Sequence, residues 1–387
     1  MPSSSRTSSI ANRLEERAGS AVALSCVDLG SALSVGQEAW DRLALSHPFP
    51  SVYMSWAWHE AWFHESSDEE RSSAFVLTDL AADRPGGPGI ILPLSGRTSR
   101  FHRLAARALE WSAADVGTAD HLDLLCDPDL DYGALADALD RRPWHLLRLA
   151  NVTEGLTRIE PLLRALEQRG HSTAVEPLWA CAQIHLPSTW EEYLSGLSSS
   201  RRYRIRKDER DLRARHEVAI RDFGANNLEE GWSHFVRLHH QRWDDGGVLR
   251  DVRLAAVYRR FLRNLSDQGG LGFLGLEIDG EIAAVDFWAE FGGVMFGIQS
   301  GRDPRWDRSS VGRVLRGIAL QEVISRGLTV ADFSRGLDDY KREWCSDERW
   351  CYDVYVFRKS IRGYAWRAWR ELVTRTRVSR RALGSRS

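Results

Sequence analysis

The sequence predicts an α/β protein of the mixed, α+β kind, in which helices flank two sheets. The chain has 387 residues, more than one simple hydrophobic core usually organises, so two modules are expected. Segments with period-two apolar alternation recur along the whole length between segments of helical period. In the second half, three consecutive strand-like segments precede one helix and a further strand, an order that indicates a mixed sheet with a helical crossover.

In the first half, strand-like and helical segments alternate. Proline and glycine mark the turn at 82–89 between two of the strands, and Gly170 ends a helix. The expected strands are 21–29, 72–81, 89–96, 144–152 and 172–187, and the expected helices are 34–46, 51–67, 131–140 and 156–170.

The second half contains the same kinds of element. Asp279 and Gly280 form the hairpin turn between two of its strands. No sequence repeat aligns between the halves, so a duplicated fold is a hypothesis at this point. The expected helices are 189–216, 227–243, 252–269 and 311–327, and the expected strands are 217–223, 271–279, 281–291, 294–302, 329–334 and 351–360.

The overall composition is that of a globular protein without a general affinity for polyanions or lipid. It is 43% apolar and 27% charged, with a net charge of −2. The five cysteines lie far apart, without paired Cys/Cys or Cys/His spacing, which argues against a zinc site and a disulfide framework and fits a reducing cytoplasm. Residues 1–19 lack a signal-peptide core and are expected to form a disordered leader. No window approaches the roughly 18 apolar residues that a membrane span needs.

The segment 332–344, DFSRGLDDYKREW, holds the most specific chemical pattern. Only three of the 52 Lys and Arg residues are lysine, so Lys341 is expected where a compact ammonium is required. Gly336 permits a tight turn after the preceding strand, which places Tyr340 and Lys341 just beyond the sheet. The plainer alternative is a solvated turn with one packed aromatic residue.

Two further features are candidates for a site. In 301–317 a strand, a polar loop and a helix follow one another, so free helix amides could bind an anion, aided by Arg305 and Arg308. The alternative is an ordinary helix capped by Ser309 or Ser310. Asp286 lies in the middle of a predicted strand, where it either points into a site or lies on an open sheet face.

Two basic segments have functional and plain interpretations. The segment 200–216 could contact phosphate groups of a coenzyme or of tRNA, or could be a solvated helix with internal ion pairs. The segment 361–387 could meet an anionic membrane as a peripheral amphipathic helix, or could be a plain helix with a frayed basic tail.

These motifs resemble the GNAT acetyltransferases. The segment RSSVGR, 308–313, is similar to the coenzyme-binding loop R/Q-x-x-G-x-G/A, with one glycine shifted and the second missing. The segment at 332–341 resembles the D-F-x-x-G-x-x-x-Y-K signature of the CelD-type, or BioF2-like, acetyltransferase domain. The blocks HPFPSVYMSWAWHEAWF, IILPL, HLDLL and SSSRRYRIRKDERDL also resemble that branch, so the likeness extends over about 36–358. Fem-type aminoacyltransferases, which are tandem GNAT folds, share the pattern more distantly.

The resemblance implies tandem GNAT-like mixed sheets and an acyl-CoA-dependent transferase, with acetyl-CoA as co-substrate and no metal. It implies an N-terminal domain at 20–180, a catalytic domain at 181–360 and a basic tail at 361–387. The acceptor would be an amine or hydroxyl of a cell-envelope sugar, polysaccharide precursor or small metabolite. The alternatives are a Fem-like transferase that uses aminoacyl-tRNA and a non-catalytic accessory protein of polysaccharide synthesis.

The same resemblance gives roles to individual residues. Tyr340 would protonate the thiolate leaving group, and Lys341 would steady the oxyanion or a phosphate. Asp286, Asp338 or Asp339 would receive the proton of the acceptor. The pyrophosphate of the coenzyme would be held by the loop residues Arg308, Ser309, Ser310, Val311, Gly312 and Arg313.

Overall fold

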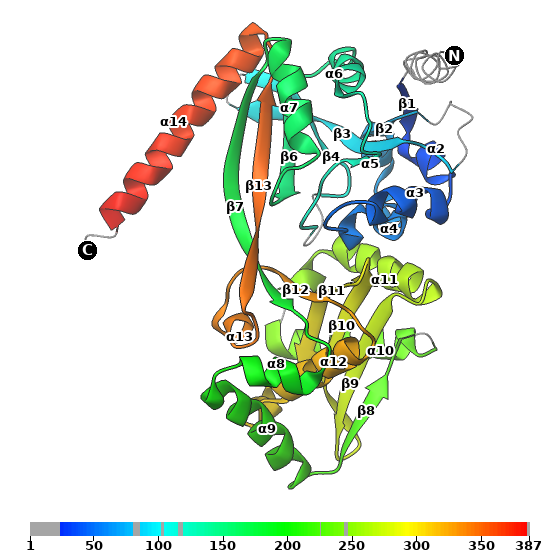
Figure 1. Ribbon diagram of the computed structural model, residues 1–387, viewed down its shortest axis with the longest axis vertical. Helices are drawn as coiled ribbons and strands as arrows, with labels where there is room; N and C mark the ends of the chain where they lie inside the picture. Colours follow the sequence, from blue (N-terminus) through cyan, green and yellow to red (C-terminus); the bar gives the residue numbers. More distant parts are fainter. Residues whose placement is uncertain are drawn as a thin grey trace, which may run out of the picture.

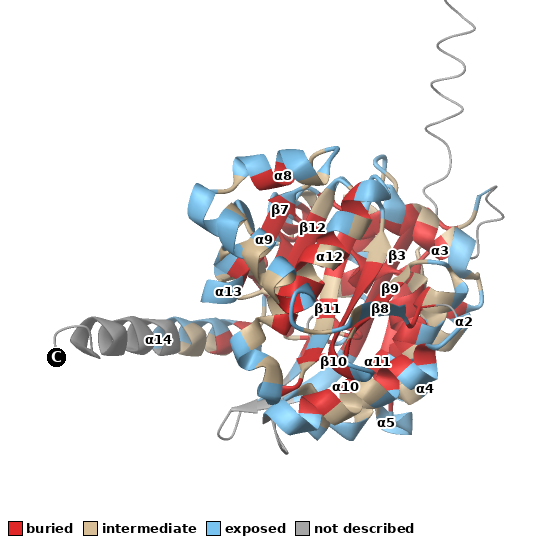
Figure 2. Ribbon diagram, turned by 90° about the horizontal axis from the view of Figure 1, so that it is seen from below, coloured by how far each residue is buried: buried red, intermediate tan, exposed pale blue. Residues whose placement is uncertain are grey.

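The structure, a computed structural model, describes residues 24–79, 86–101, 104–114, 119–224, 226–243 and 247–384. The expected leader at 1–19 lies outside these residues. One mixed sheet runs through both halves of the chain, with its strands in the order β1-β2-β3-β4-β6-β13-β7-β12-β11-β10-β9-β8 and β5 paired to β3 (Figure 1). Helices flank this sheet, and its strands hold much of the buried surface (Figure 2). The predicted mixed α/β class is therefore confirmed.

The first half of the chain follows the predicted alternation. Its strands are β1 (Ser25–Asp28), β2 (Ala74–Thr78), β3 (Ile90–Phe101), β4 (Leu104–Trp111), β5 (Leu125–Cys126), β6 (Leu146–Thr153) and β7 (Ser172–His185). Its helices are α2 (Leu29–Leu33), α3 (Gln37–Leu45), η2 (Val52–Met54), α4 (Trp56–Glu65), α5 (Asp68–Ser73), α6 (Tyr132–Asp140) and α7 (Ile159–Gln168). The sequence did not predict β4, β5, α2 or α5.

The second half starts with two helices where one was predicted, because the Ser198 side chain accepts from Arg201 N and begins a new helix after Gly196. Its helices are α8 (Trp190–Gly196), α9 (Ser199–Arg213), α10 (Leu228–Trp243), η3 (Val248–Arg250), α11 (Val252–Asp267), η4 (Pro304–Ser309), α12 (Val311–Ser325), α13 (Asp339–Arg342) and α14 (Ile361–Gly384). Its strands are β8 (Val218–Asp222), β9 (Leu271–Ile278), β10 (Glu281–Phe291), β11 (Val294–Arg302), β12 (Val330–Arg335) and β13 (Asp347–Phe357).

The two halves repeat one topology. In each, a first strand pairs with the first of three antiparallel strands, and a helical crossover then leads to a strand parallel to the third of them. The strand order is consequently symmetric about its centre. The duplicated fold, left as a hypothesis by the sequence, is visible in this order.

The final strands of the two halves are exchanged. β7, which ends the first half, pairs with β12 of the second half, and β13, which ends the second half, pairs with β6 of the first. β7 and β13 also pair with each other from Ser172–Phe357 to Gln183–Asp347, as the two long strands of Figure 1 show. The predicted boundary at 180–181 falls inside β7, and the division into domains stays a prediction.

The helix α14 follows β13 and projects from the body of the molecule (Figures 1 and 2). Its first turns are anchored where Trp366 is buried with Ala108, Leu146 and Phe357. Across the part of the chain that the structure describes, every helix is either too short or too polar to cross a membrane.

The core of the second half contains a position where only glycine fits. Gly272 on β9 lies opposite Trp288 on β10, and the indole of Trp288 covers it. A Cβ at Gly272 would be 1.9 Å from Cε2 of Trp288, far inside contact distance. Trp288 is fully buried and sits two residues from Asp286 on the same strand face, so this packing fixes the strand that carries Asp286.

We predict that Gly272→Ala lowers the free energy of unfolding by about 1–3 kcal/mol, because the added methyl group displaces a buried indole. Denaturant unfolding monitored by tryptophan fluorescence measures this change. Gly196→Ala is the matched control: nothing lies within 4 Å of its added Cβ, so stability should stay equal or rise slightly. Equal midpoints for both variants would contradict the packing argument.

Candidate active site

A cavity with a volume of about 590 Å³ contains several of the predicted site residues and lies beside the part of β11 that is not paired with β12. β11 and β12 are paired only between Val294–Phe296 and Val330–Asp332. Beyond Phe296, β11 carries a bulge, since Phe287 and Trp288 of β10 face Gln299 and Gly297. The cavity is lined by parts of β10, β11, η4, α10, α12 and the segment around α13. Its charged lining residues are Arg242, Asp286, Arg302, Asp307, Arg313, Arg316, Asp338 and Glu343.

Asp286 lines this cavity and does not lie on an open face of the sheet. Asp286 is 3% exposed, and its Oδ1 accepts a hydrogen bond of 2.9 Å from Nη2 of Arg316. Burial raises the pKa of Asp286 to about 6, although the Arg316 guanidinium acts in the opposite direction. Arg316 itself lies over the ring of Phe333 at 4.8 Å, which holds the guanidinium in place. A buried carboxyl that titrates near neutrality is suited to accept a proton.

Tyr340 also lines the cavity, at the start of the short helix α13. The residue is 57% exposed and lies at the mouth of the cavity rather than in the core. Partial desolvation and, after it, the negative charge of Asp338 raise the pKa of the phenol. The phenol therefore keeps its proton at neutral pH and is available as a donor to a leaving group.

The loop before α12 differs from an open glycine-rich loop. The 3-10 helix η4 fills it, and Ser310 adopts a left-handed conformation with φ of 53° and makes no side-chain cap. Ser310, Val311, Gly312 and Arg313, for which the sequence predicts contacts with pyrophosphate, line the cavity. Arg308 and Ser309, although both are described, are not among the lining residues.

The arginines around this loop are compensated by carboxylates. Arg305 binds Asp303 and Glu281 instead of facing the cavity. Arg313 lies in the cavity wall, but its guanidinium binds Asp208 of α9 and Glu343. Positive and negative side chains are therefore interleaved around the cavity, which does not form a uniformly cationic cradle.

Comparison with known proteins assigns this region to a family. Residues 199–342 match the acetyltransferase (GNAT) domain family. They form a GNAT acetyltransferase domain. The cavity described above lies entirely within this domain and the two residues that follow it. No curated protein matches the chain by sequence.

Solved structures resemble the chain over most of its length. FemX aligns with a TM-score of 0.56 at 9% identity, over 82% of this chain and 95% of FemX. A conserved protein of unknown function from Bacteroides thetaiotaomicron aligns at 0.51 and 11% identity, over 87% and 99%. The C-terminal domain (DUF2156) of a proposed lysylphosphatidylglycerol synthetase from Agrobacterium fabrum aligns at 0.50 and 11% identity, over 86% and 95%. At these identities the likeness concerns the fold.

Lys341 of the GNAT domain lies elsewhere than the sequence predicted. It is 5% exposed and is not among the residues that line the cavity. Its Nζ donates to the carbonyl oxygens of Ser334 and Arg335, which end β12. Burial lowers the pKa of this ammonium. The expectation that Lys341 faces the reacting group is therefore corrected: the backbone turn after β12 supplies the oxygens that need a compact donor.

The basic helix α9 of the GNAT domain is largely paired. Arg204 binds Glu343, Arg206 binds Glu191, and Lys207 and Arg213 bind acids on the same helix. These pairs are exposed to solvent. They engage basic side chains that were candidates for contacts with phosphate groups. The solvated-helix alternative describes these four residues.

A second group of polar residues lies where the GNAT domain meets the first half of the chain, and no sequence motif indicated it. Asp332 is 1% exposed and accepts from Nε2 of His121 at 3.0 Å and from Nε2 of Gln183 at 2.6 Å. Asp120 accepts from Nε1 of Trp179 at 3.0 Å and binds Arg335. His121, Gln183 and Asp332 are far apart in the sequence, so only the exchange of strands brings them together.

We predict that Lys341→Met lowers the free energy of unfolding by about 1–3 kcal/mol, because it leaves two buried carbonyl groups without their donor. Thermal or denaturant unfolding measures the loss. Tyr340→Phe serves as the control. Tyr340 is 57% exposed, so the free energy of unfolding of this variant should stay within about 0.5 kcal/mol of the native value. A Lys341→Met variant as stable as Tyr340→Phe would remove the structural role of the ammonium.

Proposed function

We propose that this protein transfers an acyl group, acetyl by preference, from acyl-CoA to an amine or hydroxyl of a sugar, polysaccharide precursor or small metabolite. One observation supports this proposal most: the buried carboxyl of Asp286 and the phenol of Tyr340 line one cavity of a GNAT domain. The CelD-type signature at 332–341 favours a sugar or polysaccharide precursor as the acceptor.

The diverging strands provide a place for the donor. Beyond Phe296, β11 is no longer paired with β12, and Gln299, Ser300 and Gly301 line the cavity. An extended ligand that carries amide groups can pair with such a strand edge through main-chain hydrogen bonds. The pantetheine arm of a coenzyme A thioester has this chemistry. The start of α12, at Ser310–Arg313, offers the positive end of a helix to its phosphates.

The chemistry follows from the two groups. The acceptor nitrogen or oxygen attacks the acyl carbonyl carbon, and its proton passes to the carboxylate of Asp286. The carbon–sulfur bond breaks, and Tyr340 gives its proton to the departing thiolate. Arg316 holds Asp286 in position by the hydrogen bond of 2.9 Å. Lys341 supports the turn that leads to Tyr340 and contacts no reacting atom in this scheme.

We predict that kcat/KM rises with pH through about 6, since Asp286 must be ionised to accept the proton. The pKa in the folded chain lies above the ordinary 3.8, so this carboxyl contributes stability at low pH that is lost as the pH rises from about 4 through 6. Asp286→Asn should abolish the rise of kcat/KM with pH and lower kcat/KM by about 100-fold or more. Tyr340→Phe should lower the rate but keep the rise of kcat/KM with pH. An Asp286→Asn enzyme with native activity would contradict the role of the base.

Two observations favour a second candidate, a Fem-like transferase that takes its acyl group from aminoacyl-tRNA. The chain aligns with FemX over 82% of its length. The arginines Arg305 and Arg313, expected to hold pyrophosphate, are neutralised by carboxylates. A tRNA donor would give binding that falls steeply with salt concentration, because cations released from the nucleic acid drive its association.

We predict that acetyl-CoA raises the thermal unfolding midpoint by several degrees, since a ligand at 100 times its Kd stabilises by about 2.7 kcal/mol. Differential scanning fluorimetry with increasing acetyl-CoA measures the shift, with desacetyl-CoA and adenosine diphosphate as controls. A flat response to all three, together with salt-sensitive binding of aminoacyl-tRNA, would replace the first candidate by the second. A folded protein that binds none of these ligands would favour a non-catalytic accessory role.

A further inference from the structure

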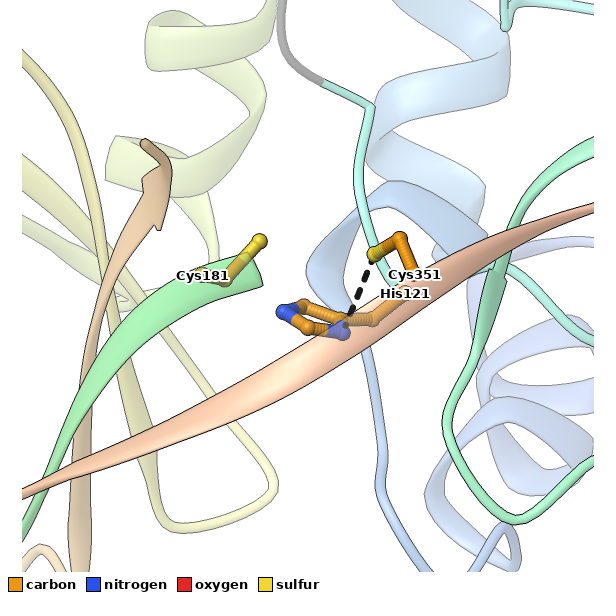
Figure 3. A group of neighbouring side chains, drawn as sticks. All are labelled: His121, Cys181 and Cys351. Carbon is orange, nitrogen blue, oxygen red and sulfur yellow. Dashed lines mark hydrogen bonds between the residues drawn. The ribbon is translucent and has the colours of Figure 1, made fainter. Parts of the chain in front are cut away.

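Three donor side chains converge at the junction between the two halves of the molecule (Figure 3). His121 comes from the segment before β5, Cys181 from β7 and Cys351 from β13, and each is fully buried. One ligand atom of each lies within 4.8 Å of the others. None of the three lines the cavity of the GNAT domain. This cluster therefore has no part in the proposed acyl transfer.

The spacing fits a small thiophilic ion. Nδ1 of His121 lies 3.6 Å from Sγ of Cys351, and Figure 3 shows the imidazole turned toward that sulfur. Around a tetrahedral zinc ion, with Zn–S of about 2.3 Å and Zn–N of about 2.0 Å, a sulfur and a nitrogen ligand stand about 3.5 Å apart. A fourth oxygen donor is near, because Oγ1 of Thr153 lies 3.5 Å from the same Nδ1.

The second nitrogen of the imidazole is already fixed by the protein. Nε2 of His121 lies 3.0 Å from Oδ2 of Asp332, and an ionised carboxylate can only accept, so Nε2 carries the proton. Nδ1 is then the nitrogen that faces Sγ of Cys351. Asp332 is held in turn by Gln183 and by the amide of Ser334. A carboxylate behind a histidine in this way is the usual outer shell of a metal ligand.

The register of the strands argues against a disulfide. Cys181 is opposite Arg349 and Cys351 is opposite Trp179, so the cysteines are diagonal neighbours on antiparallel strands. Diagonal neighbours have Cα atoms about 7–8 Å apart, beyond the roughly 4.4–6.8 Å that a disulfide spans. An ion between the sulfurs bridges the longer distance. Two thiolates also balance the charge of a divalent ion, which a buried site requires.

We propose that His121, Cys181 and Cys351 bind one Zn²⁺ ion, which fastens β7 and β13 to the first half of the chain. The ligands come from segments 60 and more residues apart in sequence, which is why cysteine spacing does not reveal them. All three ligands are buried and Thr153 lies next to them as a fourth protein donor, an arrangement that suits a structural ion.

The test starts with the native chain, purified without added metal and without a metal-affinity column, and analysed by mass spectrometry of the elements. We expect about one zinc per chain in the native protein and in Cys126→Ser, which changes a buried cysteine of β5 that does not belong to the cluster. Cys351→Ser and Cys181→Ser should contain little or none. Asp332→Asn should weaken zinc binding about 10–100-fold in competition with a chelator.

A spectroscopic measurement keeps the test independent of how well the serine variants fold. Native protein is stripped with a chelator under reducing conditions and loaded with Co²⁺. Thiolate-to-cobalt charge-transfer absorption, displaced by an equivalent of Zn²⁺, supports the site. A native chain that is folded and reduced, yet contains no zinc and gives no such absorption, overturns the proposal. A disulfide joining Cys181 and Cys351 in denatured, alkylated native protein also overturns it.

Discussion

The antiparallel pairing of β7 with β13 is the constraint on which the rest of the structure depends. Each of these strands ends one half of the chain and lies beside the parallel strand of the other half. Removing either would leave an unpaired edge in the middle of the sheet, where backbone groups have no water to satisfy them. The halves are therefore not independent sheets joined by a linker. The same pairing makes Cys181 and Cys351 diagonal neighbours. The pairing of β7 with β12 places Gln183 beside Asp332, so the buried polar cluster exists only because the strands are exchanged.

The cavity is a second consequence of that arrangement. β12 pairs with β7 on one side, and its Asp332 is held by His121 and Gln183, so it cannot follow β11 when β11 bulges after Phe296. The hydroxyl of Ser334 donates to Gly297 O across the gap that opens. The divergence is thus fixed by bonds to the first half of the chain. In this way the first half shapes the site of the GNAT domain although its side chains do not line the cavity.

Local sequence patterns predicted the features of this molecule that depend on residues close together in the sequence. Alternating apolar residues identified most strands, and the charged residue in the middle of a strand identified Asp286 as a candidate. β4 was missed because LAARALEW has the composition of a helix, and its strand conformation comes from pairing with β3 and β6. Arg316 and the cluster around His121 were missed for a related reason: each depends on partners from distant segments. The strand exchange has no local signal, because every strand in it is an ordinary strand by sequence.

The structure explains why position 341 holds a lysine in a chain where almost every other cation is arginine. The turn after β12 directs two carbonyl oxygens, those of Ser334 and Arg335, toward one point inside the protein. A guanidinium is planar, wide and fixed in its donor directions, whereas an ammonium is compact and can turn its hydrogens to two acceptors. Ser334 at a φ of 59° and Gly336 at 93° hold this turn in a conformation that L-residues rarely adopt, and the ammonium stabilises it. Tyr340 precedes Lys341 directly, so the lysine acts on the cavity by fixing the segment that carries the phenol.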